Sequence, residues 1–222
     1  MSHADFVHLR VRSAYSLLDG ALHPPRIVAL AKEHRLPAVG LVDERNLFGA
    51  LEFAMKASDA GVQPITGAIL PISRDAGEIE AGIRRPPADD LVLLAQNEAG
   101  YANLMRLMSW AYLQSAAEHD PELALEHLEG MTEGLIALTG GPDGAVDRLL
   151  RERQDPQAER RLEALKALFP DRLYVELQRL GRPEEGVVEP KLIDLAYKHD
   201  LPLVATGDVR FDVAEMHEAH DA

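Results

Sequence analysis

Residues 38–61 read AVGLVDERNLFGALEFAMKASDAG, and this stretch contains the repeating unit on which the fold prediction depends. AVGLV (38–42) is almost continuously apolar, which is typical of a strand that is covered on both faces of a parallel sheet. The segment from about Asn46 to Ala60 has the apolar spacing of a helix, and Gly61 follows in the position where glycine commonly ends one. The stretch therefore predicts a buried strand followed by a helix.

The same alternation of strand and helix continues in both directions. FVHLRV (6–11) comes before it, with a helix near residues 24–34 that has Pro24-Pro25 near its start. The later strand-like segments are QPITG and AILPI (63–72), LVLLA (91–95), LIALT (135–139), YVELQ (174–178) and LPLVAT (201–206). Repeated alternation of this kind predicts a parallel sheet with right-handed crossovers. Because no GxGxxG or P-loop follows a strand, we favour a closed or nearly closed α/β barrel.

The 222 residues are enough for one large domain or two small ones, and 46% of them are hydrophobic, which is normal for a globular protein with a core. Two longer connections, 73–90 and 115–131, are predicted to be surface excursions. Cysteine is absent, which excludes disulfides and cysteine-ligated metals. Neither a secretory signal nor an apolar run of the ~18 residues needed for a membrane span is present, so we expect a cytoplasmic protein. A formal net charge of −14 argues against a major nucleic-acid-binding surface in this segment.

Polar residues collect near the carboxyl ends of the predicted strands, where β/α barrels carry their chemistry. They are His8, Arg10, Arg12 and Asp19 with the first strand, Asp43, Glu44 and Arg45 with the second, Gln178 and Arg179 with YVELQ, and Asp208 and Arg210 with LPLVAT. Asp90 lies immediately before LVLLA, so it belongs either to the approach of that strand or to the same edge. We expect most of these charged groups to converge.

The residue types in this group do not predict a catalytic site by themselves. Arginine stays protonated and cannot ligate a metal. His8 is the one histidine on a predicted strand, and HEAH (217–220) is interpreted as a solvated terminal helix. No nucleophile elbow is present for serine chemistry. The residues alone therefore predict a charged strand edge without catalytic equipment.

A family resemblance becomes visible in these same blocks. The runs FVHLRVRSAYSLLDGA, LVDERNLFGALEFAMKASDAGVQPITGA, LVLLAQNEAGYANLMRLMSWAY, GLIALTGG, YVELQRLGRPEE and LPLVATGDVRF occur in order. They resemble the PHP (polymerase and histidinol phosphatase) domain at the N-terminus of the bacterial replicative DNA polymerase III alpha subunits, a family of C-family polymerases. The resemblance implies a single domain over residues 1–222, a distorted (β/α)7 barrel of PHP type, as the N-terminal fragment of a much longer polymerase chain. Active members hold two or three divalent metals and hydrolyse phosphoesters.

The chain departs from the metal-binding pattern of that family. Arg10 and Arg12 stand where the family has a His-x-His, and Glu44 stands where it has a His after Val42-Asp43. Ile69 replaces a Glu, and Asp90 and Leu180 replace further histidines. The terminal Asp-x-His is represented by Asp208 and Arg210, and Asp19 occupies the remaining ligand position. Asp19 and Asp208 alone keep a ligand type. His8 matches a family residue just before the His-x-His and is not taken as a ligand.

The repulsion between an arginine and a metal ion indicates what these substitutions mean. A guanidinium about 5 Å from a divalent ion, at an effective dielectric of ~20, repels it by roughly 7 kcal/mol. We therefore expect neither a metal nor a catalytic residue in this domain. Our hypothesis is a fixed ionic network in the space of the metals. It would pair Arg10, Arg12 and Arg210 with Asp19, Asp43, Glu44 and Asp208, with His8 beside them.

The resemblance also implies a parent chain and its partners. The parent would be the DNA-directed DNA polymerase of chromosomal replication, with Mg²⁺ as its cofactor. The implied partners are the rest of the polymerase chain, a proofreading exonuclease subunit, and DNA through other domains, with no membrane. The domain itself would be an inactive structural module and docking surface. The alternative is a metal-dependent phosphoesterase or 3′–5′ exonuclease with unusual ligands, namely Asp19, Glu44, Asp90, Asp208 and His8.

Overall fold

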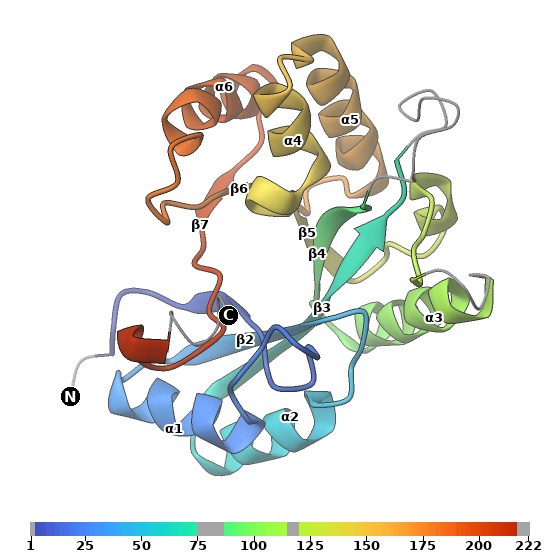
Figure 1. The fold of residues 1–222 in the computed structure, drawn as a ribbon. Helices are drawn as coiled ribbons and strands as arrows, with labels where there is room; N and C mark the ends of the chain where they lie inside the picture. The colour runs from blue at the N-terminus through green and yellow to red at the C-terminus, as the bar shows by residue number, and fades with distance from the viewer. Residues whose placement is uncertain (1–2, 75–86, 115–119, 217–222) are drawn as a thin grey trace. The chain divides into compact units, whose positions relative to one another are not determined.

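A computed structural model describes residues 3–74, 87–114 and 120–216 of the chain. The chain divides into two compact units. The first unit consists of Met1–Ala68 together with Thr206–Ala222, and the second consists of Ile69–Ala205. Figure 1 shows the elements of both units.

The first unit is a small sheet with two helices. Its elements are β1 (His8–Val11), α1 (Pro24–Glu33), β2 (Ala38–Glu44), α2 (Ala50–Asp59), most of β3 (Gln63–Ile72) and the short 3₁₀ helix η4 (Ala214–Met216). The strand order is β1-β2-β3, and β1 runs parallel to β2 with Val11 opposite Leu41. The helices α1 and α2 pack against each other, and Figure 1 shows them side by side.

The core of the first unit explains why these elements form. The helix α1 begins at Pro24, since a proline in the first turn lacks only an N–H that would have no helical partner. It buries Ile27, Val28 and Ala31 against the apolar residues of β2. Gly40 lets the two strands approach closely, because a Cβ there would lie 2.6 Å from the Leu9 carbonyl oxygen.

The second unit contains the remaining strands. Its elements are the end of β3, β4 (Asp89–Ala95), α3 (Glu98–Gln114), β5 (Leu135–Leu138), α4 (Ala145–Arg151), α5 (Asp155–Leu168), β6 (Leu173–Leu177), α6 (Glu185–Lys198), β7 (Leu203–Ala205) and the 3₁₀ helices η2 (Leu125–Leu128) and η3 (Gly141–Asp143). The strand order continues β3-β4-β5-β6-β7. The helix α3 packs on β4 and β5, whereas α4 packs on both α5 and α6 (Figure 1).

The expectation of an entirely parallel sheet is wrong at the pairing of β4 with β5. β4 runs antiparallel to β5, with Val92 opposite Leu138, whereas β5, β6 and β7 are parallel to one another. LVLLA is apolar because both of its faces are covered, and such a pattern does not distinguish the two strand directions. One consequence is that Asp90, at the beginning of β4, lies beside the segment that follows β5, where it forms an isolated bridge with Gly144.

Most other predicted elements are confirmed, with two corrections. The helix predicted from Asn46 begins at Ala50, because Asn46 belongs to a turn in which its Oδ1 accepts a hydrogen bond from the Phe48 N–H at 3.0 Å. The excursion predicted at 115–131 is not all surface, since Leu123 and Leu128 are buried and Leu123 bridges to Ile72. Most of the excursion predicted at 73–90 lies outside the described residues.

No helix in the described part of the chain is both long enough and apolar enough to cross a membrane.

Two helical glycines of the second unit provide a matched test of its packing. A Cβ on Gly100 would overlap with the Gly134 carbonyl oxygen, whereas a Cβ on Gly186 would meet nothing within 4 Å. We expect Gly100→Ala to lower the free energy of unfolding by about 1–3 kcal/mol through overpacking. Gly186→Ala should raise it by up to about 1 kcal/mol, because alanine loses less backbone entropy in a helix. Urea denaturation of both variants checks this, and equal effects would contradict the described approach of α3 to Gly134.

Candidate functional site

A backbone pairing in the first unit brings two distant segments together. β1 ends at Val11, which bridges in parallel to Val209. The Arg12 N–H donates to the Val209 carbonyl at 2.9 Å, and the Val209 N–H donates to the Arg10 carbonyl at 3.1 Å. Because side chains alternate along an extended chain, residues on either side of Val11 and of Val209 project to the same face. Arg10, Arg12 and the segment after β7 therefore present their charged side chains together.

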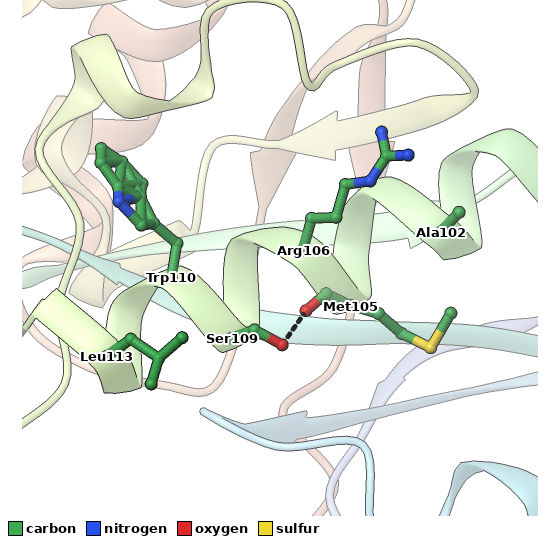
Figure 2. Close-up of a pocket in the computed structure, with 6 residues that line it drawn as sticks. All are labelled: Ala102, Met105, Arg106, Ser109, Trp110 and Leu113. Carbon is green, nitrogen blue, oxygen red and sulfur yellow. Dashed lines mark hydrogen bonds between the residues drawn. The ribbon is translucent and has the colours of Figure 1, made fainter.

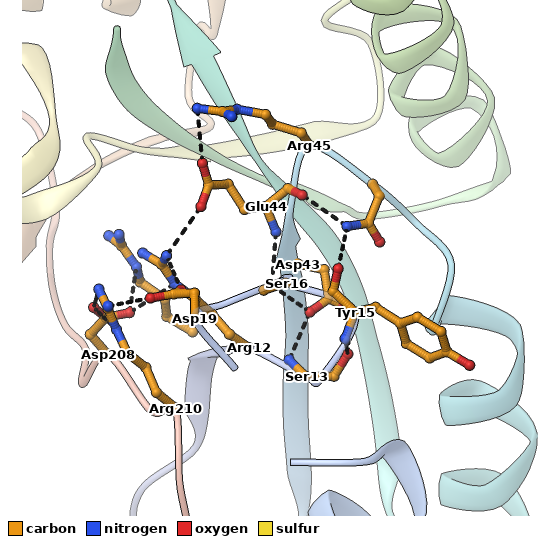
Figure 3. A network of polar contacts seen from close by, with 12 residues as sticks. Arg12, Ser13, Tyr15, Ser16, Asp19, Asp43, Glu44, Arg45, Asp208 and Arg210 are labelled. Atoms are coloured by element: carbon orange, nitrogen blue, oxygen red, sulfur yellow. Dashed lines mark hydrogen bonds and ion pairs between the residues drawn. The ribbon is translucent and has the colours of Figure 1, made fainter. Parts of the chain in front are cut away.

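Asp208 is the centre of the resulting cluster. Its Oδ1 lies 3.4 Å from the Arg10 Nε and 3.2 Å from the Arg12 Nε. Its Oδ2 accepts hydrogen bonds from the Arg210 Nη2 at 2.7 Å and Nε at 3.0 Å. The Asp208 side chain is only 4% exposed. One buried carboxylate thus faces three guanidinium groups, as Figure 3 shows for Arg12 and Arg210.

Two further carboxylates complete the cluster. Asp19 accepts hydrogen bonds from both Arg12 and Arg210, one on each oxygen. Glu44, at the end of β2, lies 3.6 Å from the Arg12 Nη1, and its other oxygen lies 3.1 Å from the Arg45 Nη2 (Figure 3). Three arginines of the first and last segments therefore face three carboxylates. We call these six side chains the ionic network: Arg10, Arg12, Asp19, Glu44, Asp208 and Arg210.

The network keeps Asp208 ionised although it is buried. Burial alone would raise the pKa of this carboxyl group, because the charged form loses its hydration. The charges of Arg10, Arg12 and Arg210 outweigh that cost, and the pKa of Asp208 is lower than its ordinary value. Asp208 is therefore a carboxylate throughout the neutral range.

The prediction for Asp43 is wrong in its partners. Asp43 accepts hydrogen bonds from the Ser13 N–H at 2.7 Å, the Ser13 Oγ at 2.8 Å and the Ser16 Oγ at 2.8 Å, rather than pairing with an arginine. Asp43 and Glu44 are neighbours on β2, so strand alternation sends their side chains to opposite faces. Asp43 instead fixes the loop after β1, which carries Asp19. Neither Ser13 nor Ser16 was predicted from the sequence as a partner of this carboxylate.

His8 also lies outside the network. Its ring contacts the Phe6 ring edge-on, with centroids 4.9 Å apart, and it makes no ion pair with any described residue. Burial, with a smaller contribution from the nearby His34, lowers the pKa of His8. A half-buried neutral imidazole at this place contributes packing rather than charge, so its predicted supporting role is wrong.

Three of the predicted positions belong to the second unit. Ile69 is fully buried in β3 and has no ligating atom. Leu180 is 45% exposed, and its N–H donates to Glu185 Oε1 at 2.8 Å. Asp90 begins β4. Neither Ile69 nor Leu180 can bind a cation with its side chain, whatever surrounds it.

The second unit also buries Asp89 and Glu176, two acidic strand residues that were not predicted as site residues from the sequence. Asp89 forms a bidentate ion pair with Arg148, at 2.6 Å to Nε and 2.9 Å to Nη2. Glu176, on β6, accepts hydrogen bonds from the Gly140 N–H at 3.1 Å and from Gln178 Nε2 at 3.0 Å. Their positions inside apolar strands were the available signal, since a charged residue is seldom fully buried unless it has a partner.

A group of metal-ligating side chains and a surface hollow are further candidates for a binding site. Among the described residues, one grouping of three metal-ligating side chains occurs, formed by Glu159, Glu163 and His199. Glu159 is already paired with Lys198 at 2.5 Å, whose ammonium competes with any cation. An open hollow of about 430 Å³ lies along α3 between Ala102 and Leu113 (Figure 2). Its one hydroxyl, on Ser109, donates to the Met105 carbonyl, so its lining does not suggest catalysis.

Comparison with known proteins assigns this arrangement to a family. The family model of the PHP domain matches residues 8–180. The chain is a member of the PHP domain family. Solved structures share its fold at low identity. An amidohydrolase from Chromobacterium violaceum matches with a TM-score of 0.60 and 14% identity. A proposed metal-dependent phosphoesterase from Bifidobacterium adolescentis matches with a TM-score of 0.55 and 15% identity. Each alignment covers 92% of this chain and 87% of the other. The predicted PHP-type α/β fold class is confirmed.

Relatives with much higher identity are polymerase subunits. The chain is 50% identical over 218 residues to DNA polymerase III subunit alpha of Caulobacter vibrioides. These aligned residues make up 98% of this chain. It is 35% identical over 221 residues to the subunit of the same name from Escherichia coli. The chain spans about one fifth of the length of these relatives, 19% and 18% respectively.

The PHP residues of the ionic network do not fit a metal cluster. Guanidinium groups have no lone pair to offer, and those of Arg10 and Arg12 are buried against Asp208. The oxygens of Asp19 and Asp208 that a cation would need are engaged by Arg12 and Arg210. A divalent ion would have to displace these charges from a low-dielectric site, which costs several kcal/mol per ion.

We expect Asp208→Asn to lower the free energy of unfolding at pH 7 by about 3–5 kcal/mol, because three guanidinium groups then lose their central counter-charge. Asp59→Asn, at an exposed position on α2, serves as the matched control and should change it by less than about 0.5 kcal/mol. Urea denaturation measures both values.

The pH dependence of the same pair provides a second readout. The folded-state pKa of Asp208 is lower than the unfolded value of 3.8, so its stabilisation is fully present above that pH. It is lost as the pH falls further, toward the folded-state pKa. The difference between the wild type and Asp208→Asn should therefore be constant from pH 5 to 8 and shrink below about pH 4. A difference that grows on acidification would contradict the ion pairs.

Proposed function

We propose that this chain is the PHP segment of a DNA polymerase III alpha subunit, and that its former metal site now acts as a structural ionic network. The parent chain would be a DNA-directed DNA polymerase that uses Mg²⁺ in its other domains. The high identity to two such subunits supports the parentage. The observation that carries the structural role is the placement of three arginines around Asp208.

The network supports a structural role because of its energetics. Buried ion pairs add little net stability compared with well-packed apolar residues, yet they are costly to break singly. Such a cluster fixes geometry: it holds β1, the loop after it, the end of β2 and the segment after β7 in one arrangement. In this proposal the first unit of the PHP domain is a fixed structural element of the polymerase.

A separate proofreading subunit follows from the same proposal. If the PHP site binds no metal, it cannot hydrolyse a mismatched primer end, and the polymerase needs another nuclease. We therefore propose that the domain also forms part of the docking surface for an exonuclease subunit. The alternative, a PHP phosphoesterase or exonuclease with unusual ligands, requires Asp19, Glu44 and Asp208 to exchange their arginine partners for a metal.

Metal binding separates these two functions directly. We expect isothermal titration of the 222-residue chain with Mn²⁺ to show no stoichiometric binding, because the network already neutralises its carboxylates. Hydrolysis of p-nitrophenyl phosphate in Mn²⁺ should not exceed that of the Asp208→Asn variant. Stoichiometric Mn²⁺ together with turnover that Asp208→Asn abolishes would establish the alternative instead.

The parent polymerase gives a functional prediction. We expect the full-length chain to extend a primed template in Mg²⁺ but to leave a mismatched 3′ terminus intact. Addition of the exonuclease subunit from the same organism should restore removal of the mismatch, as followed on a labelled primer by gel electrophoresis. Removal by the full-length chain alone, if lost in Asp208→Asn, would show that the PHP site is a nuclease.

A further inference from the structure

The second unit carries a group of metal-ligating side chains that the proposed function does not use. Glu159 and Glu163 lie one turn apart on α5, and His199 follows the last residue of α6. One ligand atom from each of these side chains lies within 4.8 Å of the other two. The His199 Nε2 lies 2.7 Å from Glu159 Oε1. An imidazole and two carboxylates therefore face one another where α5 meets the end of α6.

Hydrogen bonds hold the imidazole in its place. The His199 N–H donates to the Leu195 carbonyl at 3.0 Å, as part of the last turn of α6. The His199 carbonyl accepts a hydrogen bond from Lys166 Nζ at 2.5 Å, and Lys166 belongs to α5, the helix that carries the two glutamates. The His199 side chain is only 13% exposed. The chain thus provides a fixed nitrogen ligand beside two carboxylates.

The charges of this group favour a bound cation. Two carboxylates at i and i+4 on one helix, as in Glu159 and Glu163, repel each other. The carboxyl end of a helix also carries a partial negative charge, and His199 lies at that end of α6. Hydrogen bonds from Lys198, and to a smaller extent from His199, keep the pKa of Glu159 below its ordinary value. Glu159 is therefore a carboxylate throughout the neutral range.

We propose that Glu159, Glu163 and His199 form a binding site for Zn²⁺ that joins α5 to the end of α6. Zinc binds histidine nitrogen at about 2.0–2.1 Å and carboxylate oxygen at about 2.0–2.2 Å, usually with four ligands. Donor atoms as close as these three surround one ion after small side-chain rotations, with water in the fourth position. The imidazole binds through Nε2 and carries its proton on Nδ1, so a neutral histidine loses no net proton.

The ligand types select zinc among the common divalent ions. Mg²⁺ and Ca²⁺ prefer sites made of oxygen atoms alone, whereas imidazole nitrogen suits zinc. Mn²⁺ binds a given set of nitrogen and oxygen ligands more weakly than Zn²⁺ does. The three residues also belong to the second unit, whereas the ionic network belongs to the first. The zinc site is therefore separate from the PHP metal positions, and it does not depend on the proposed function.

Lys198 is the competitor that zinc has to displace. Its ammonium lies 2.5 Å from Glu159 Oε1, and its side chain is 61% exposed. The ammonium can therefore move into water when the ion binds. An exposed ion pair of this kind changes an equilibrium constant by no more than about five-fold. Lys198 thus weakens the zinc site without abolishing it.

Isothermal titration of the 222-residue chain with ZnCl₂ tests the proposal. We expect the wild type to bind one equivalent of zinc, and His199→Gln to bind it at least about ten-fold more weakly, since even loss of an outer partner of a metal ligand costs about 10–100-fold. His34→Gln is the matched control and should leave the affinity unchanged, because His34 likewise follows the end of a helix, α1, but is not in the group. Lys198→Gln should tighten binding about two- to five-fold.

A second pair of variants keeps the result independent of folding. Glu163 is exposed, so Glu163→Gln should leave the melting temperature of the metal-free chain unchanged and still weaken zinc binding. Glu52→Gln, at an exposed position on α2, removes the same charge elsewhere and should leave the affinity unchanged. Equal weakening by both substitutions would overturn the proposal, because it would show a general attraction of zinc to an acidic chain.

Other outcomes would also overturn the zinc site. Absence of zinc binding by the wild type would do so directly. Equal affinity of the wild type and His199→Gln would place the ion elsewhere, for example at the histidines of residues 217–220. A weaker affinity in Lys198→Gln would show that this ammonium does not compete with the ion. The proposed function is tested separately, by Mn²⁺ titration and primer extension, so its failure is recognised independently.

Discussion

The first unit depends on a single buried carboxylate, Asp208, and on the guanidinium groups that neutralise it. The short parallel pairing of Val11 with Val209 places these charges next to one another. Each charge would be very unfavourable if buried alone, so the backbone pairing and the ion pairs require each other. Residues almost 200 positions apart in the sequence are thereby held in one arrangement.

Arginine can replace a metal as the centre of such a cluster, but only in some respects. Both provide positive charge to carboxylates gathered at one end of a sheet. A guanidinium also has five N–H donors in a fixed plane, so it orders the carboxylates around it through directed hydrogen bonds. It offers no open coordination position and cannot activate water. In the function that we propose, the exchange keeps the architecture of a PHP site without its capacity for hydrolysis.

The sequence predicted the convergence of Arg10, Arg12, Asp208 and Arg210, because charged residues at strand ends of an α/β fold meet at one edge. Strand alternation alone would have placed Asp43 and Glu44 on opposite faces of β2. It would not have identified Ser13 and Ser16 as the partners of Asp43, because serine is common in any loop. The antiparallel direction of β4 was also beyond reach. Direction depends on how α3 and the connection after it return to the sheet, and an apolar strand carries no record of that path.

The network and the exposure of Leu17 and Leu18 are two consequences of one loop. The loop of residues 13–19 is fixed at its beginning by the hydrogen bond from Ser13 to Asp43 and at its end by the ion pair of Asp19 with Arg12. Between these contacts, Leu17 and Leu18 are exposed to solvent. A loop closed around exchangeable metal ions would change its shape with their occupancy. A loop closed by arginines does not, because its counter-charges are part of the chain. A permanent ionic closure therefore suits the structural role that we propose for this domain, because the loop keeps one shape without any bound ion.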